Sequence, residues 1–291
     1  GNGRIESVQV DVSSKYAGRI LEILVHEGDL VRKGQVLAKM DVAELQAQLA
    51  SGEAKIAEAM ENENQIKAEI VERESMVRYQ QQVFDRNREL YSRRVISREE
   101  LEQSQTKREI SRASVDAVKA KLAVNAKTIE AARADVERIK AQIEDSTLSS
   151  PVNGRVLYRL AEEREVLSAG GKVLTLINLD DLYMEIFLPS QQAARVVVGS
   201  EARIVLDAFP EYYAPARVSF VSPEAQFTPK QVETRSERDK LMFRVKLRVP
   251  EALVLPYLER IKTGVRGMGY VRIDPEAAWP PRLDQLFPQL R

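Results

Sequence analysis

The sequence predicts a mixed α and β, multidomain and elongated fold. A long antiparallel α-helical coiled-coil hairpin is expected to be inserted into a small β-sandwich, with a small β-barrel and a terminal β-domain as further parts. Three observations predict it: a long charged run with a seven-residue apolar repeat, two related β-rich stretches flanking that run, and short strand-like segments punctuated by Pro and Gly. The expected domains are residues 1–12 with 251–291 (terminal β-domain), 13–41 with 147–180 (sandwich), 42–146 (hairpin) and 181–250 (barrel).

The first β-rich stretch begins with alternating valines at positions 8, 10 and 12. Gly28-Asp29 then favours a β-hairpin, and Gly34 marks another turn between short β-branched runs. Asp41, with Glu44 three residues later, predicts the N-cap of a helix and its reciprocal partner.

The central run, Val42 to Asp145, contains no Pro, and its one Gly is Gly52. Two ladders with seven-residue spacing predict a narrow apolar seam on each of two helices that meet at a tight tip near Arg94–Ser97. Each helix of roughly 50 residues would be about 75 Å long. The ladders are Leu49, Ile56, Glu63, Ile70, Val77, Phe84 and Tyr91, then Leu101, Arg108, Val115, Leu122, Ile129, Val136 and Ile143, with Glu63 and Arg108 as the only breaks.

The second β-rich stretch resembles the first. Gly154–Leu157 matches Gly18–Leu21 in pattern, and Gly171–Leu174 matches Gly34–Leu37. Because neither half can bury its apolar face alone, we expect the halves to pair into one sandwich with the hairpin inserted between them.

The remaining sequence is β-rich. Strands are expected at 182–188, 202–206, 217–221 and 241–249, with an exposed polar loop between Gln226 and Lys240. If Ile5–Val12 and Val265–Ile273 pair, they would form the terminal β-domain.

Composition argues against several classes of function. Lys plus Arg and Asp plus Glu both number 44, so the net charge favours neither nucleic acid nor an anionic membrane as a partner. There is no cysteine, and no apolar stretch approaches the roughly 18 residues of a membrane span. Either the native protein is soluble, or its export signal and any anchor lie outside this sequence.

The sequence offers no catalytic, metal-binding or cofactor-binding set. His26 is the only histidine and is expected at the surface, and Lys39 is expected to be an exposed β lysine. A phosphate-binding loop is missing. The six methionines are scattered rather than clustered for Cu(I), and Met60 and Met76 are expected to pack along or beside the helix seam.

The order half-motif, helical hairpin, half-motif and barrel resembles the HlyD-like periplasmic adaptors, or membrane fusion proteins, of Gram-negative export systems. The resemblance rests on the lipoyl-like stretch 17–37 and its second half, Ser150–Val156. It implies a periplasmic protein associated with the inner membrane. Such proteins form a ring between an inner-membrane transporter and a TolC-like outer-membrane channel, and the terminal domain would be membrane-proximal. Residues 227–234 and 241–245 look most like the branch that serves ABC-type exporters.

The resemblance also implies a channel-binding site at the hairpin tip. Adaptors that meet a TolC-like channel have an Arg, a Leu four residues later and a Ser seven after that. Here Arg86, Leu90 and Ser97 match this spacing, and Glu100 matches a following acidic position. Departures from the pattern concern the choice of channel: Asn87, Val95, Glu102 and Ser104.

Other interpretations remain open. Ser97 with Glu100 is also an ordinary capping box, and Arg86 could be a solvated charge on the helix. The expected function is a non-enzymatic adaptor in a tripartite efflux or secretion system. The alternatives are a coiled-coil scaffold or tether without a transport role, and an acyl-carrier module.

Overall fold

A computed structural model describes residues 1–226, 242–254, 262–274 and 276–287. The chain divides into two compact units, a helical unit (Asp41–Ser146) and a β unit (Gly1–Met40 with Thr147–Arg291). None of the helices in the described ranges combines the length and apolar character needed to cross a bilayer.

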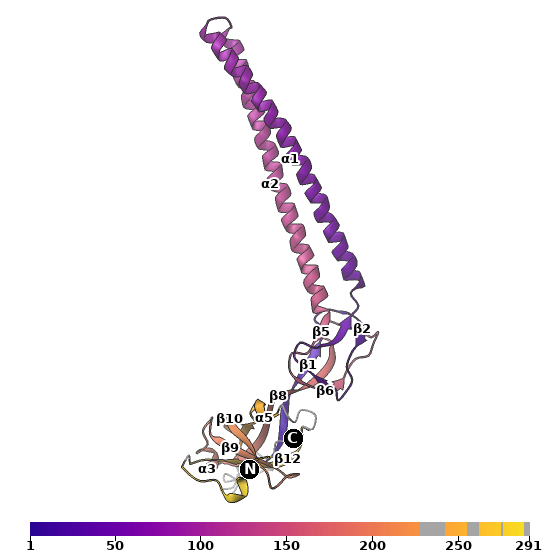
Figure 1. Cartoon of the computed structure of the whole chain (residues 1–291), viewed down its shortest axis with the longest axis vertical. Helices are drawn as coiled ribbons and strands as arrows, with labels where there is room; N and C mark the ends of the chain where they lie inside the picture. The colour runs from indigo at the N-terminus through magenta and orange to yellow at the C-terminus, as the bar shows by residue number, and fades with distance from the viewer. Residues whose placement is uncertain (227–241, 255–261, 275, 288–291) are drawn as a thin grey trace. The chain divides into compact units, whose positions relative to one another are not determined.

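The helical unit consists of α1 (Ala43–Ser92) and α2 (Arg98–Asp145), which lie side by side in opposite directions (Figure 1). These bounds confirm the two long helices expected between residues 42 and 146. The buried residues of α2 recur mostly at intervals of three, four or seven, so α2 turns one narrow stripe toward α1. They are Ser104, Val115, Val118, Asn125, Ile129, Val136 and Ile139.

The two charged residues that interrupt the apolar ladders are accommodated differently. The Arg108 guanidinium lies 4.2 Å from the centroid of the Phe84 ring on α1, and its side chain is only 18% exposed. A cation over an aromatic face retains favourable electrostatics while its stem covers apolar surface. Glu63 instead pairs with Lys67 on its own helix, at 2.6 Å. The seam therefore continues past both positions.

The predicted N-cap of α1 is wrong by one residue. Val42 is the N-cap and makes no capping hydrogen bond through its side chain. Asp41 Oδ1 accepts a hydrogen bond from the Ala43 amide at 3.0 Å. The carboxylate thus bonds the backbone two residues ahead, as in an Asx turn, and the expected reciprocal bond with Glu44 is not the capping arrangement here.

In its described residues, the β unit contains two sheets. The larger has the strand order β1-β12-β9-β10-β11-β8-β6-β3, and β1 also pairs with β8, so that six strands close into a ring. Its strands are β1 (Asn2–Ser13), β3 (Leu30–Val31), β6 (Gly154–Arg159), β8 (Lys172–Pro189), β9 (Glu201–Leu206), β10 (Ala214–Gln226), β11 (Met242–Arg248) and β12 (Arg266–Val271). The smaller sheet has the order β5-β4-β2-β7: Thr147–Ser149, Val36–Met40, Gly18–Ile23 and Val166–Leu167. Short helical segments are α3 (Ser190–Ala193), α5 (Glu251–Val254) and the 3-10 turn Pro281–Leu283.

The two β-rich halves pair with each other, as the sequence predicts. Strand β2 pairs with β7, β3 with β6, and β4 with β5. The hairpin expected at Gly28-Asp29 is wrong, because β2 and β3 belong to different sheets and β3 pairs with β6 from the second half. A turn does form there, with φ of +91° at Gly28.

The described part of the β unit has two hydrophobic cores. One is built by both halves of the lipoyl-like region, with Ile20, Leu37 and Leu174 fully buried. The other combines strands β8 to β11 with Ile5 of β1, around Met184, Ile186 and Leu247. The terminal segments do pair, at Gly3 with Gly267, but β1 and β12 also join the ring formed with β8–β11. The division into four domains stays a prediction.

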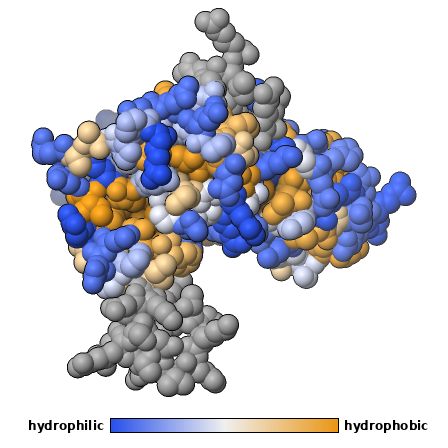
Figure 2. Space-filling view, turned by 90° about the horizontal axis from the view of Figure 1, so that it is seen from below, coloured by the Kyte–Doolittle hydropathy of each residue, from blue (hydrophilic) through white to orange (hydrophobic). Residues whose placement is uncertain are grey.

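Some apolar side chains of the β unit remain uncovered. Figure 2 shows apolar areas between polar side chains on the face seen from below. Val197 and Val198, which follow α3, are 68% and 61% exposed, and Phe209 and Leu286 are each 49% exposed. The polar loop and the exporter-like stretch predicted at 227–240 lie outside the described residues.

Candidate functional site

The turn between α1 and α2 begins with a Schellman motif. The Arg94 amide donates to the Tyr91 carbonyl at 2.9 Å, and the Val95 amide donates to the Leu90 carbonyl at 3.0 Å. This pattern satisfies carbonyl groups at the helix end and requires a left-handed residue, usually Gly, just after the C-cap. Arg94 occupies that position with φ of 57°. The turn is therefore tightly defined, although its left-handed residue is not a glycine.

A capping box begins α2. Ser97 Oγ accepts from the Glu100 amide at 3.2 Å, and Glu100 Oε2 accepts from the Ser97 amide at 3.2 Å. The two side chains satisfy amides that the first helical turn leaves without intrahelical partners. The capping interpretation of Ser97 and Glu100 is thus confirmed. Both residues remain exposed, so capping leaves their outer surfaces accessible.

Arg86 and Leu90 lie four residues apart on α1, and therefore on one face of the helix. Arg86 is exposed and Leu90 is half-buried. Ser97 and Glu100 are joined by hydrogen bonds, and the Leu90 carbonyl accepts a hydrogen bond from the Val95 amide in the turn. The four predicted residues thus lie on the two helix ends that the turn connects.

Salt bridges within each helix flank the turn. Arg93 pairs with Glu89 at 2.5 Å on α1, and Arg98 pairs with Glu102 at 2.7 Å on α2. The hydrogen bond that Arg98 donates to Glu102 raises the pKa of the Arg98 guanidinium above its usual value. All four side chains are well exposed, and these pairs contribute little to stability. Their main effect is to orient charge around the tip.

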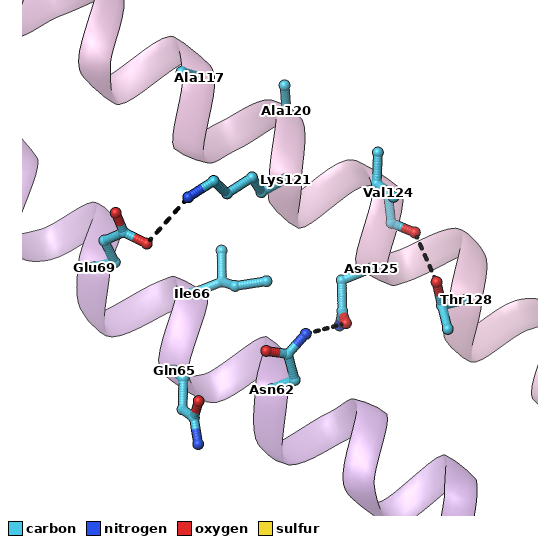
Figure 3. A pocket seen from close by; sticks show the side chains of 10 residues that line it. All are labelled: Asn62, Gln65, Ile66, Glu69, Ala117, Ala120, Lys121, Val124, Asn125 and Thr128. Atoms are coloured by element: carbon cyan, nitrogen blue, oxygen red, sulfur yellow. Dashed lines mark hydrogen bonds and ion pairs between the residues drawn. The ribbon is translucent and has the colours of Figure 1, made fainter.

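A polar contact interrupts the helix seam midway along α1 and α2. Asn62 Nδ2 donates to Asn125 Oδ1 at 2.7 Å, and Asn125 Nδ2 donates to the Ala59 carbonyl at 2.9 Å. Figure 3 shows the two amides bonded to each other and the Lys121 side chain directed toward Glu69. Lys121 Nζ lies 3.9 Å from Glu69 Oε2, and all four residues line a groove of about 760 Å³ between the helices. The buried amide of Asn125, bonded across the seam to Asn62 and to the Ala59 carbonyl, favours one register of the helices over its neighbours.

Other residues singled out in the sequence lie at the surface. The His26 side chain is 81% exposed, and Lys39 pairs with Glu22 at 2.7 Å on the surface of the β unit. Met60 and Met76 are 47% and 52% exposed, so they lie beside the seam and fill little of it. In the described ranges, no group of three or more His, Asp or Glu side chains could hold a metal ion.

Sequence reasoning missed the conformation of the tip residue Arg94 and the exposure of Val95, which is 65%. A Gly normally signals a Schellman motif, and no Gly occurs near this turn. The sequence carries only an indirect signal for this turn. The α1 ladder ends at Tyr91 and the N-cap of α2 is Ser97, so the chain has few residues in which to reverse direction.

The fold and the sequence together define the class of protein to which this chain belongs. Residues 8–177, more than half of the chain, match the family model described as RND MFP, barrel-sandwich hybrid domain. The chain belongs to this family of membrane fusion proteins, or periplasmic adaptors, whose members work with transporters and are generally not enzymes.

Particular relatives agree with this assignment. A UPF0194 membrane protein of Yersinia enterocolitica is 29% identical over 274 residues, covering 86% of this chain and 84% of the relative. Among solved structures, MacA from Actinobacillus actinomycetemcomitans aligns with a TM-score of 0.62 and 18% identity, covering 93% of this chain and 76% of MacA. The membrane fusion protein Spr0693 from Streptococcus pneumoniae aligns with a TM-score of 0.64 and 18% identity, covering 94% and 97%. At these identities the solved structures show the fold alone.

Proposed function

We propose that this protein is a periplasmic adaptor subunit that links an inner-membrane transporter, of ABC type by preference, to a TolC-like outer-membrane channel. It would act in a tripartite efflux or secretion system, would be associated with the inner membrane, and would catalyse no reaction itself. The tip residues Arg86, Leu90, Ser97 and Glu100 would contact the channel. Several copies would assemble into a ring, because many weak tip contacts acting together supply the affinity that one contact lacks.

The tip is the main support for this proposal. Arg86 and Ser97 present polar groups to solvent, and Leu90 is a half-buried apolar side chain on the same helix face as Arg86. Paired helices that dock end-on against other helices need an apolar side chain for packing and donors for the carbonyl groups exposed at a helical turn. This set provides both. The capping bonds of Ser97 do not consume the outward surface that such a contact would use.

Finer features of the fold fit the same role. The regular spacing of the buried α2 residues supports a two-stranded coiled coil, which is stiff enough to present a tip at a distance. The closed ring of six strands supports a barrel. Uncovered apolar side chains such as Val197 and Phe209 are candidates for contacts with the transporter or with neighbouring copies.

A binding experiment tests the proposal. The chain would be applied to a purified TolC-like channel in detergent, both as the wild type and after fusion to an oligomerising tag that provides multivalency. Leu90→Asp places a charge in the expected contact and should abolish binding. Arg88→Glu is the control, since Arg88 is also exposed on α1 but lies off the face shared by Arg86 and Leu90.

Helix content, measured by circular dichroism, must be the same in both variants. Binding that Leu90→Asp removes and Arg88→Glu retains would support the docking role. No binding of the tagged wild type at any workable concentration would contradict the proposal and favour a scaffold or tether without a transport role.

A further inference from the structure

The apex of the tip has a local conformation that its sequence does not favour. Two described non-glycine residues have positive φ, and both are arginines: Arg94 at 57° and Arg164 at 68°. The left-handed region brings Cβ close to the following carbonyl oxygen, so Gly is the residue that local stability would select at Arg94. The residue at this position is nevertheless an arginine.

The residue after Arg94 is also atypical. In a Schellman motif, the residue that donates the outer hydrogen bond commonly packs an apolar side chain against the last helical turn. Val95 donates that bond to the Leu90 carbonyl, yet its side chain is 65% exposed. An apolar side chain at the end of a helix pair is thus left in water.

Arg94 differs from the nearest arginines, Arg93 and Arg98, in its ion pairing. Arg93 and Arg98 are paired with Glu89 and Glu102. Within the part of the chain that the structure describes, the Arg94 side chain makes no hydrogen bond or ion pair, and it is exposed. The apex therefore presents a solvent-exposed guanidinium, without a partner among the described residues, next in sequence to the exposed apolar side chain of Val95.

We propose that Arg94 and Val95 form the apical contact with the channel and determine which channel is accepted. This inference rests on the proposed function and deepens it. The complementary surface is acidic or rich in exposed carbonyl groups, because a guanidinium needs acceptors, and it includes an apolar recess for Val95. The matched partner is the periplasmic end of a TolC-like channel that carries carboxylates beside an apolar cleft. The strained backbone at Arg94 is the local cost of placing the guanidinium at the apex.

Substitution of Arg94 by Gly separates this role from a structural one. Arg94→Gly removes the guanidinium and relieves the left-handed strain, so the melting temperature of the helical unit should stay the same or rise. Affinity for a purified TolC-like channel should nevertheless fall about tenfold. Arg164→Gly is the matched control, because it makes the same change at the other left-handed arginine, in the β unit. It should leave channel affinity unchanged.

A second measurement locates the contact directly. A photoreactive amino acid at position 95 should cross-link to the channel, whereas the same residue at position 166 should not. Val95 and Val166 are similarly exposed, at 65% and 68%, so accessibility does not distinguish them.

The possible outcomes separate the inference from the proposed function. Wild-type binding that Arg94→Gly leaves intact, or a cross-link from position 166 and none from 95, overturns the apical contact alone. Failure of the wild type to bind overturns the proposed function and the inference with it.

Discussion

Gly52 is buried on α1 at a close approach to α2, and replacing it tests the packing of the hairpin. A Cβ built on Gly52 would lie 2.9 Å from Val136 Cγ2 on α2. Val136 is 3% exposed, and its branched side chain has little rotameric freedom in a helix, so it cannot move aside cheaply. Gly52→Ala therefore sets a gain in helix propensity against a steric conflict.

The two effects have opposite signs and can be weighed. The alanine gains about 1 kcal/mol in intrinsic helix propensity. Overpacking of a tight core contact costs about 2 kcal/mol. We expect Gly52→Ala to destabilise the helical unit by about 1 kcal/mol, as the difference between these terms. In a Val136→Ala background the conflict is gone, and Gly52→Ala should stabilise by about 1 kcal/mol.

Urea unfolding followed by the helical circular dichroism signal would measure all four members of this double-mutant cycle. If Gly52 and Val136 are in contact, the effect of Gly52→Ala on stability changes sign between the two backgrounds. Equal stabilisation in both backgrounds would show that the two residues are not in contact.

Two further predictions concern polar contacts, and urea midpoints measure both. Asn125→Ala should lower the stability of the helical unit by about 1–2 kcal/mol, since Asn125 is 6% exposed and bonds both Asn62 and the Ala59 carbonyl. Asn62→Ala should lower the stability by less, because Asn62 is exposed and water can replace it as the donor to Asn125 Oδ1. An equal or larger loss of stability in Asn62→Ala would contradict this ranking. Asp11 on β1 accepts hydrogen bonds from Lys172 at 2.6 Å and from Thr175 at 2.7 Å, and these lower the pKa of its carboxyl group. A lowered pKa in the folded state means that the stabilising contribution is present above the unfolded-state pKa and is lost as pH falls through the folded-state value. Asp11→Asn should therefore destabilise the β unit at pH 7 and have little effect at acidic pH below the folded-state pKa, whereas a difference independent of pH would show that the ionised carboxylate is not responsible.

The helical unit was predictable because its determinants are local and periodic. A seven-residue repeat without Pro defines two helices, and the structure has them at Ala43–Ser92 and Arg98–Asp145. The Ser97–Glu100 capping box follows from adjacent residue types alone. The N-cap of α1 was missed because Asp41 can bond either its own turn or the helix, and sequence does not decide between these.

The β unit was less predictable because its partners are distant in sequence. Gly28-Asp29 carries a correct turn signal, but the strand after it pairs with β6, more than 120 residues later. A turn signal is local and says nothing about such a partner. The left-handed Arg94 could not be foreseen for a different reason: its conformation is imposed by the surrounding hydrogen bonds of the turn, against the preference of the residue itself.

A structure of this chain bound to a TolC-like channel, determined by electron cryomicroscopy, would show whether the helical tip docks on the channel. We expect Arg86, Leu90 and Ser97 to lie within about 4 Å of channel atoms, with Arg94 and Val95 at the apex of the contact. A complex in which the channel contacts the β unit while the helical tip remains in solvent would exclude docking through the tip.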